Sequence, residues 1–317
     1  MTLVVVGHEF EKKVTFSWGK DTGDTPKKAG MKPVGLFAVA DSSITAPNSN
    51  GKQTILGGFR KIYPVEIKVW EPFFNGVYFR GYLEVHYEAE CFVAIAGSTL
   101  TAQHVLNLIS EHLRKIRISY ERAKELLTPG KYVLIRHCQR NELEVNQGID
   151  EWAEDMFTPN DYIDLVTASD IAKIVEYSIN EALTSARKYK IDEQSLKAMY
   201  SEFAVGIYCP KEKNHQLFVF RMKNRINAEG LLEVYAAKER IEEGRVAVLG
   251  MKSEFEVMAQ DAMQTAIEEE ISPSRKFFDF INKAIDKVRD NGSFAIDRPS
   301  VCKVFQEGQL KTVFHQK

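Results

Sequence analysis

Long apolar runs and alternating segments predict strands in the first hundred residues. Thr2–Gly7 is rich in β-branched residues and Val34–Ala40 is almost entirely apolar, and both patterns indicate buried strands. Between them, residues 8–32 are polar and contain several Gly and Pro, with an alternating stretch at 14–18 that suggests a ragged hairpin. The pattern further predicts a polar loop over 46–58, a strand over 65–70, a strand pair within 76–88 and a short strand over 91–96.

Helical periodicity follows in four segments. A first long helix is predicted to run to about Leu127, with Thr99 or Thr101 as its cap, because apolar residues recur near every 3.6 positions. A second long helix is predicted from about Ala168 to Tyr189, with Ser169 as its cap. The remaining two are predicted over 254–270 and 277–289, on either side of a Ser-Pro-Ser break.

Further strands lie between and after these helices. They are predicted at 132–135, 203–209, 216–222, 231–237, 245–249, 300–305 and 310–314, and residues 139–161 are acidic and irregular. The resulting order is strands, two long helices, strands, two helices, strands. Strict βαβ alternation is missing, so we expect an α+β fold in which helices pack outside two antiparallel sheets.

Composition narrows the class of protein. The 317 residues are 44% hydrophobic and 27% charged, with a formal net charge of −2, which is typical of a globular protein and gives no reason to expect nucleic acid as a partner. No apolar run approaches the roughly 20 residues that span a bilayer, and no signal-peptide layout is present. The four cysteines are Cys91, Cys138, Cys209 and Cys302, and they form no CxxC pair. We therefore expect buried thiols in a cytoplasmic protein.

Three short motifs, in order, stand out beside a threonine directly behind Met1. They are Ala40-Asp41-Ser42-Ser43-Ile44-Thr45, Arg60-Lys61-Ile62 and the stretch from Ala94-Ile95-Ala96-Gly97-Ser98 to Gln103. With these motifs the chain resembles the proteasome β-subunit family, including bacterial proteasome-like peptidase subunits. The resemblance implies a four-layer αββα sandwich as a single domain over 1–317, with insertions around 8–32, 64–90 and 131–200.

The resemblance also implies a mechanism and a set of site residues. Thr2, exposed by removal of Met1, would be the nucleophile and its own α-amine the base, since that amine has a reference pKa near 7.7–8. Lys61 would lie beside Thr2 and Asp41 would hold Lys61. The Gly97 backbone N–H would face the oxyanion, and Thr45 with Gly97 would bind an extended peptide. The implied protein is a threonine endopeptidase in a homo-oligomeric ring, supplied with unfolded chains by a separate ATP-dependent unfoldase.

Two places depart from the family pattern. Asp290 and Ser293 match its Asp-x-x-Ser element near the amine, but Phe294 follows where glycines are usual. The Gly-Ser-Gly turn is replaced by Gly250-Met251-Lys252, with Ser253 two places late. If Met251 takes the place of the serine, a hydroxyl that assists proton transfer is lost. An inactive scaffold or regulatory subunit is therefore the alternative hypothesis.

Other chemistry finds less support in the sequence. Thr15 is a rival nucleophile only if a propeptide is cleaved after Val14, and such cleavage usually follows glycine. The seven histidines show no metal-ligand spacing, and no nucleotide-binding glycine loop is present, so no cofactor or metal is expected. An amide-cleaving enzyme that acts on small molecules is a third possibility, but no motif in the sequence indicates it.

Overall fold

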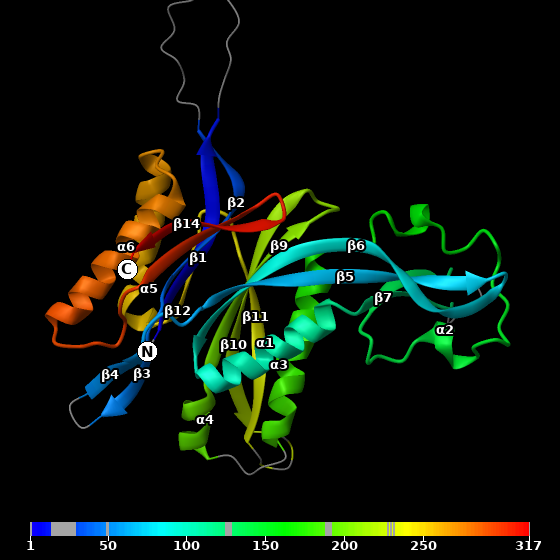
Figure 1. Ribbon diagram of the computed structural model, residues 1–317, viewed down its shortest axis with the longest axis horizontal. Coiled ribbons are helices and arrows are strands. Elements are labelled where there is room, and N and C mark those ends of the chain that lie inside the picture. The colour runs from blue at the N-terminus through cyan, green and yellow to red at the C-terminus, as the bar shows by residue number, and fades with distance from the viewer. Residues whose placement is uncertain are drawn as a thin grey trace, which may run out of the picture.

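The computed structural model describes residues 2–13, 30–48, 51–123, 129–187, 192–226, 228, 230 and 232–316. Two sheets and a separate hairpin account for the described strands (Figure 1). The first sheet has the strand order β12-β1-β2-β13-β14, and all its pairings are antiparallel. Its strands are β1 (Leu3–Lys12), β2 (Met31–Asp41), β12 (Val246–Gly250), β13 (Ser300–Gln306) and β14 (Gln309–Gln316).

The second sheet has seven strands in the order β11-β10-β9-β6-β5-β7-β8. It is antiparallel except where β5 and β7 run parallel, with Val69 opposite Ile116, so the expectation of purely antiparallel sheets is wrong at this one pairing. Its strands are β5 (Ile62–Asn75), β6 (Tyr78–Gly97), β7 (Ile116–Glu121), β8 (Lys131–Ile135), β9 (Ser201–Cys209), β10 (Asn214–Ile226) and β11 (Leu232–Ile241).

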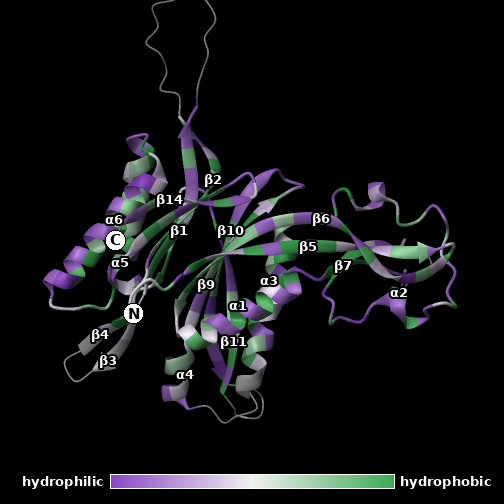
Figure 2. Ribbon diagram, viewed as in Figure 1, coloured by the Kyte–Doolittle hydropathy of each residue, from purple (hydrophilic) through white to green (hydrophobic). Residues whose placement is uncertain are grey.

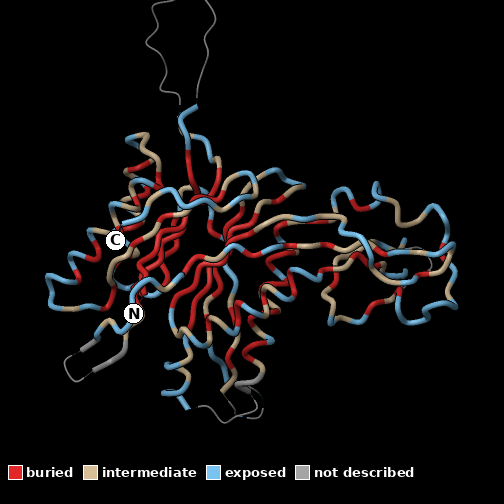
Figure 3. Tube along the Cα trace, viewed as in Figure 1, coloured by how far each residue is buried: buried red, intermediate tan, exposed pale blue. Residues whose placement is uncertain are grey.

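Strand β1 explains how the two sheets are joined. Its side chains alternate: Val4 and Val6 pack in one apolar cluster with β6 and β9 of the second sheet, whereas Leu3 and Val5 pack in another with the last two helices. Because both faces of the first half of β1 are covered, residues 3–6 are continuously apolar rather than alternating. Figure 3 shows this concentration of buried positions at the centre of the molecule.

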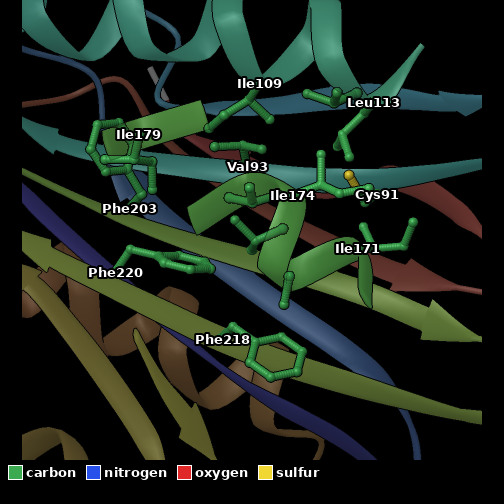
Figure 4. Packing of buried hydrophobic residues seen from close by; sticks show 14 of the residues in the cluster. Cys91, Val93, Ile109, Leu113, Ile171, Ile174, Ile179, Phe203, Phe218 and Phe220 are labelled. Atoms are coloured by element: carbon green, nitrogen blue, oxygen red, sulfur yellow. The ribbon is translucent and has the colours of Figure 1, made fainter. Parts of the chain in front are cut away.

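Helices cover the opposite face of each sheet. Helices α5 (Lys252–Glu268) and α6 (Pro273–Asp290) share a cluster with the first sheet. Helices α1 (Thr99–Leu113) and α3 (Ala168–Arg187) share another with the second sheet, as Figure 4 shows for Ile109, Ile171 and Phe203. The expected α+β fold with helices outside the sheets is confirmed at this level, and α4 (Glu193–Met199) is a further short helix.

Hydropathy along α6 illustrates why these helices form. Its buried residues recur at helical spacing, so one face is apolar and the other is charged: Phe277, Ile281, Ala284, Ile285 and Val288. Hydrophobic and hydrophilic residues accordingly alternate along α6 in Figure 2. Pro273 begins the helix, where its missing N–H costs no hydrogen bond. None of the described helices is both long enough and apolar enough to cross a bilayer.

Strands β5 and β6 extend far beyond the sheets as one long arm (Figure 1). Around its outer part lie α2 (Glu142–Val145), the 3-10 helix Pro159–Tyr162 and strands β7 and β8. A small aromatic cluster gives this arm a core of its own, in which Phe79, Leu143 and Trp152 are buried. Most of the arm falls in the regions predicted as insertions, 64–90 and 131–200, whereas β7 (Ile116–Glu121) lies outside both ranges.

Several predicted element boundaries are wrong. The strand pair within 76–88 and the strand at 91–96 form the single strand β6, and the polar loop over 46–58 contains the hairpin of β3 (Ile44–Asn48) and β4 (Gly51–Leu56). The first helix ends at Leu113, fourteen residues early, because Ile116 and Ile118 belong to β7. These two side chains are two positions apart and both buried, a strand period that the helical pattern concealed.

The predicted helix caps also change. The N-cap of α1 is Ser98 rather than Thr99 or Thr101, and its side-chain oxygen accepts from the Thr101 hydroxyl at 3.2 Å instead of capping a backbone N–H. For α3, the Thr167 hydroxyl accepts a hydrogen bond from the Asp170 backbone N–H at 3.2 Å, so Thr167 takes the role predicted for Ser169. The irregular segment 139–161 contains two short helical turns. The alternating stretch 14–18 and Thr15 lie outside the described residues.

Candidate active site

The start of β1 and the end of β2 meet at Thr2 and Asp41. Strand pairing sets Val4 opposite Ala40, which brings the first residues of the chain beside the last residues of β2. The Leu3 backbone N–H donates to Asp41 Oδ1 at 2.9 Å. Thr2 is largely buried at this junction. The two apolar runs recognised in the sequence therefore pair as neighbouring strands, and this pairing places an acid next to the residue proposed as nucleophile.

Asp41 is fully buried, and both of its carboxylate oxygens accept hydrogen bonds. Lys61 Nζ donates to Oδ1 at 2.8 Å, and the Ser43 backbone N–H and hydroxyl donate to Oδ2 at 3.1 and 2.6 Å. A buried carboxylate is costly unless it is paired and hydrogen-bonded in this way. The predicted pairing of Asp41 with Lys61 is present.

Lys61 is itself almost completely buried at the start of the second sheet. Burial lowers the pKa of its ammonium group, while the charge and hydrogen bond of Asp41 oppose that shift. The carboxylate thus holds the lysine at a fixed position in a site from which water is largely excluded. Such a lysine can influence a neighbouring amine far more strongly than an exposed one.

A cavity of about 50 Å³ connects the predicted residues. Thr2, Thr45, Lys61 and Gly97 all line it, although they come from four different segments of the chain. The other lining residues are Ser43, Ile44, Phe59, Ile95, Ala96, Thr99 and Ala102. Both sheets and the start of α1 therefore contribute to one cavity, and four of the residues singled out in the sequence lie at it.

Gly97 ends β6 in a conformation that requires glycine. Its φ angle is +105°, and a Cβ atom there would lie 2.3 Å from the Tyr200 carbonyl oxygen. The Ser98 N–H donates to the same oxygen at 2.9 Å, which fixes the turn from β6 into α1. The backbone is therefore held rigidly at the cavity wall.

A second glycine turn touches Thr2 directly. Gly250 has a φ angle of +84°, and a Cβ atom would lie 1.9 Å from the Thr2 carbonyl oxygen. The Met251 N–H donates to that oxygen at 3.0 Å. Met251 is the N-cap of α5, and its side chain is buried in the core between α5, α6 and the first sheet. Ser253 is exposed in the first turn of α5, so neither residue provides a hydroxyl at the cavity lining.

Glu202 was not anticipated as part of this region. It is buried, and its Oε2 accepts from the Gly250 N–H at 2.7 Å. Its Oε1 accepts from Arg221 Nε at 3.1 Å and from the Tyr200 hydroxyl at 3.2 Å. One feature of the sequence could have identified Glu202: it is an acid at the second position of an otherwise apolar strand, β9. A charge in such a strand needs partners that satisfy it.

Asp290 and Ser293 do not lie at the cavity. Asp290 is exposed at the end of α6, and the Ser293 N–H donates to the Val288 carbonyl at 3.1 Å as part of the helix terminus. Neither lines the cavity. As placed by the structure, these two members of the predicted set belong to a turn outside the lining.

A second Asp-x-x-Ser sequence, Asp297-Arg298-Pro299-Ser300, lies closer. Ser300 is buried and pairs with Asp41 across β13 and β2, and the Ser42 hydroxyl donates to the Pro299 carbonyl at 2.5 Å. The Ser300 hydroxyl donates to Asn282 Oδ1 at 2.8 Å. The spacing alone could have identified this alternative, because it repeats the motif seven residues later.

Within the described ranges, no three His, Cys, Asp or Glu side chains gather as a metal site. The cavity offers a hydroxyl, an ammonium group and backbone amides. These groups suit nucleophilic attack and oxyanion stabilisation at a carbonyl, and they need no bound cofactor.

Comparison with known proteins gives structural matches only. The chain matches no family model and no curated protein. Among solved structures it is similar to a Gly-1 mutant of Anbu from Hyphomicrobium sp. strain MC1, with a TM-score of 0.41 and 10% identity over 100% of this chain and 86% of the other. It is also similar to Anbu, described as an ancestral beta-subunit, from Yersinia bercovieri, with a TM-score of 0.39 and 12% identity over 98% and 87% of the two chains.

Proposed function

We propose that this chain is a threonine-type endopeptidase subunit that uses Thr2, after removal of Met1, as an N-terminal nucleophile. The observation that carries the proposal is the shared cavity, where Thr2, Lys61 and Gly97 meet while Asp41 anchors Lys61 at 2.8 Å. These residues are the ones that the proteasome-like motifs singled out. We further propose that the two sheets and their helices form the four-layer αββα sandwich of that family.

The proposed reaction uses groups of this chain alone. The neutral α-amine of Thr2 takes the hydroxyl proton as Oγ1 attacks the scissile carbonyl, and the proton then passes to the leaving amine. Lys61 favours the neutral amine by like-charge repulsion. The Gly97 N–H stabilises the oxyanion. Water, activated by the same amine, then hydrolyses the ester on Thr2 and regenerates the free hydroxyl.

The test combines the mass of the N-terminus with labelling. A peptide epoxyketone requires both the hydroxyl and the free α-amine of an N-terminal threonine. We expect the purified chain to lack Met1 and to gain one adduct on Thr2, whereas Thr2→Ala should gain none and lose all peptide hydrolysis. Thr2→Ser is the matched control and should retain labelling. A chain that lacks Met1 but resists the label would contradict the peptidase assignment.

The alternative function is an inactive scaffold or regulatory subunit of the same fold. The observation that favours it is Met251, whose backbone holds the Thr2 carbonyl while its side chain lies in the helical core. No hydroxyl from this turn lines the cavity. This hypothesis predicts an assembled protein without any Thr2 adduct, and a single adduct would end it.

A homo-oligomeric ring, with entry controlled by a separate unfoldase, completes the proposal. Enclosing the sites would restrict hydrolysis to unfolded chains. The mass of the native protein in solution tests the ring: a multiple of the 36.1 kDa chain in the range of a closed ring is expected. A monomer at micromolar concentration would contradict the ring, although the chemistry at Thr2 would still stand or fall by the label.

A further inference from the structure

A second group of reactive side chains lies near the end of α1 that is remote from Thr2. His112 follows Thr99, a cavity residue, by thirteen positions, which is roughly 20 Å along a helix. Cys138 follows β8, and its Sγ lies 3.7 Å from His112 Nε2. The Tyr177 hydroxyl of α3 lies 4.0 Å from the same sulfur. Three separate segments therefore converge on the Cys138 thiol.

The hydrogen bond to Ser178 determines which ring nitrogen of His112 carries the proton. The Ser178 hydroxyl donates to the Ile174 carbonyl at 2.7 Å, so its oxygen can only accept from His112 Nδ1, which lies 2.8 Å away. Nδ1 therefore carries the ring proton, and Nε2 presents its lone pair to Cys138. An oriented base beside a thiol is the arrangement that activates a cysteine nucleophile.

Burial and neighbouring charges together lower the pKa of His112, so its ring is available as a base. Burial lowers the pKa of His112, His137 and Arg136 lower it further, and Glu111 and Glu181 oppose them. The imidazole is thus neutral near pH 7 and can accept a proton. Arg136 also stacks over the ring of Tyr177, with its guanidinium carbon 3.6 Å from the ring centroid, and the hydroxyl of this tyrosine is the group that lies 4.0 Å from the sulfur.

Access separates Cys138 from the other cysteines. Cys91, Cys209 and Cys302 are buried as expected, whereas Cys138 is exposed, so the expectation of a buried thiol is wrong at this position. Burial raises the pKa of Cys91 and of Cys302, which keeps those thiols protonated and unreactive. Reaction with a soluble reagent should therefore be confined to one position.

We propose that Cys138 is a reactive thiol that exchanges with small disulfides, with His112 as its base. His112 Nε2 takes the thiol proton while Cys138 Sγ attacks one sulfur of the disulfide. The S–S bond of the reagent breaks, a mixed disulfide forms on Cys138, and the proton on His112 passes to the released thiolate, or to water when the leaving thiol is acidic enough to stay ionised at pH 7. The reaction is an exchange, so the disulfide itself supplies the oxidising equivalent.

The test measures the rate of reaction with 5,5′-dithiobis(2-nitrobenzoate), which releases a coloured thiolate. We expect one fast equivalent at pH 7 that maps to Cys138 and is absent from Cys138→Ser. His112→Gln should slow it at least tenfold. His137→Gln is the matched control, because its ring packs against His112 while the polar contacts described for Cys138 Sγ are with His112 and Tyr177, and its rate should stay within twofold. Equal rates in His112→Gln and the wild type would overturn the proposal.

The pH dependence of the wild-type rate gives a second test that needs no substitution. An ordinary thiol, with a pKa near 8.5, should lose about 25-fold in rate between pH 8 and pH 6.5. A thiol deprotonated by a neutral imidazole should lose less than threefold over that range. If His112→Gln fails to fold, the pH dependence of the wild-type rate tests the proposal by itself. A 25-fold fall, as for an ordinary thiol, would refute the role of His112.

Discussion

Two buried carboxylates flank Thr2, and they differ in what their partners do. Asp41 is paired with Lys61, a cation that is itself buried and lines the cavity. Glu202 is paired with Arg221, whose side chain is 15% exposed and also contacts the exposed Glu239. Asp41 accepts a hydrogen bond from the backbone N–H of Leu3, the residue after Thr2. Glu202 accepts one from the Gly250 N–H, in the turn that touches the Thr2 carbonyl.

This difference predicts how strongly each pair should respond to the loss of one charged partner. Removing a partner from a fully buried pair leaves a charge without compensation. Removing one from a pair that has a second, exposed partner leaves that charge partly satisfied. Asp41–Lys61 is therefore a charge arrangement at the cavity itself, and Glu202–Arg221 is a support for the backbone around Thr2.

The largest effect is expected from Lys61→Met, which leaves Asp41 buried without its counter-ion. The free energy of unfolding should fall by about 3–5 kcal/mol, as measured by urea denaturation. Labelling of Thr2 should fall even in molecules that remain folded. Lys68→Met removes a half-buried surface cation and is the matched control, with a loss of about 1 kcal/mol or less. Equal losses in the two variants would show that the buried pair is not special.

Acid should destabilise the protein through His8, which lies on β1 opposite Leu36, several positions along the strand from the two carboxylates at Thr2. Burial lowers the pKa of His8 from 6.5 to about 4, and His215 and Arg240 also act on it. Because the unfolded chain binds a proton between these values and the folded chain does not, stability is full above pH 6.5 and falls toward pH 4. The loss should approach about 3 kcal/mol. Denaturation midpoints measured across this range check the prediction.

The matching control for the acid effect is His8→Phe, which cannot take up a proton. Whatever its stability at neutral pH, its loss between pH 6.5 and 4 should be smaller than that of the wild type by most of this amount. An unchanged slope would contradict the role of His8 in the acid sensitivity.

The smallest effect is expected from Glu202→Gln, which keeps the shape and weakens the hydrogen bonds to Gly250 and Arg221. The cost should be about 1–3 kcal/mol, because Arg221 retains Glu239. If Glu202 supports the turn at Thr2, the rate of epoxyketone labelling should also fall. Glu239→Gln removes the exposed partner, 61% accessible, and should change both quantities little. Identical behaviour of the two variants would remove Glu202 from the site.

The sequence anticipated Asp41, Lys61, Thr45 and Gly97 better than it anticipated Glu202 or Ser300. The first four belong to short motifs at strand ends, where a polar residue interrupts an apolar run. Glu202 is a single acid inside a strand and acquires meaning only through Gly250, 48 residues later. Asp290–Ser293 and Asp297–Ser300 share one spacing, and only the pairing of β13 with β2 distinguishes them.

Local pattern by itself determined most strands, the two C-terminal helices and the α+β class, because periodicity reports which faces are covered. It could not determine that β6 is one strand of twenty residues or that residues 116–121 leave the helix for the second sheet. Those outcomes depend on strand partners far away in the sequence. The tertiary structure alone decided that Glu202 lies behind the turn at Thr2, since burying a charge is affordable only where a distant partner arrives to satisfy it.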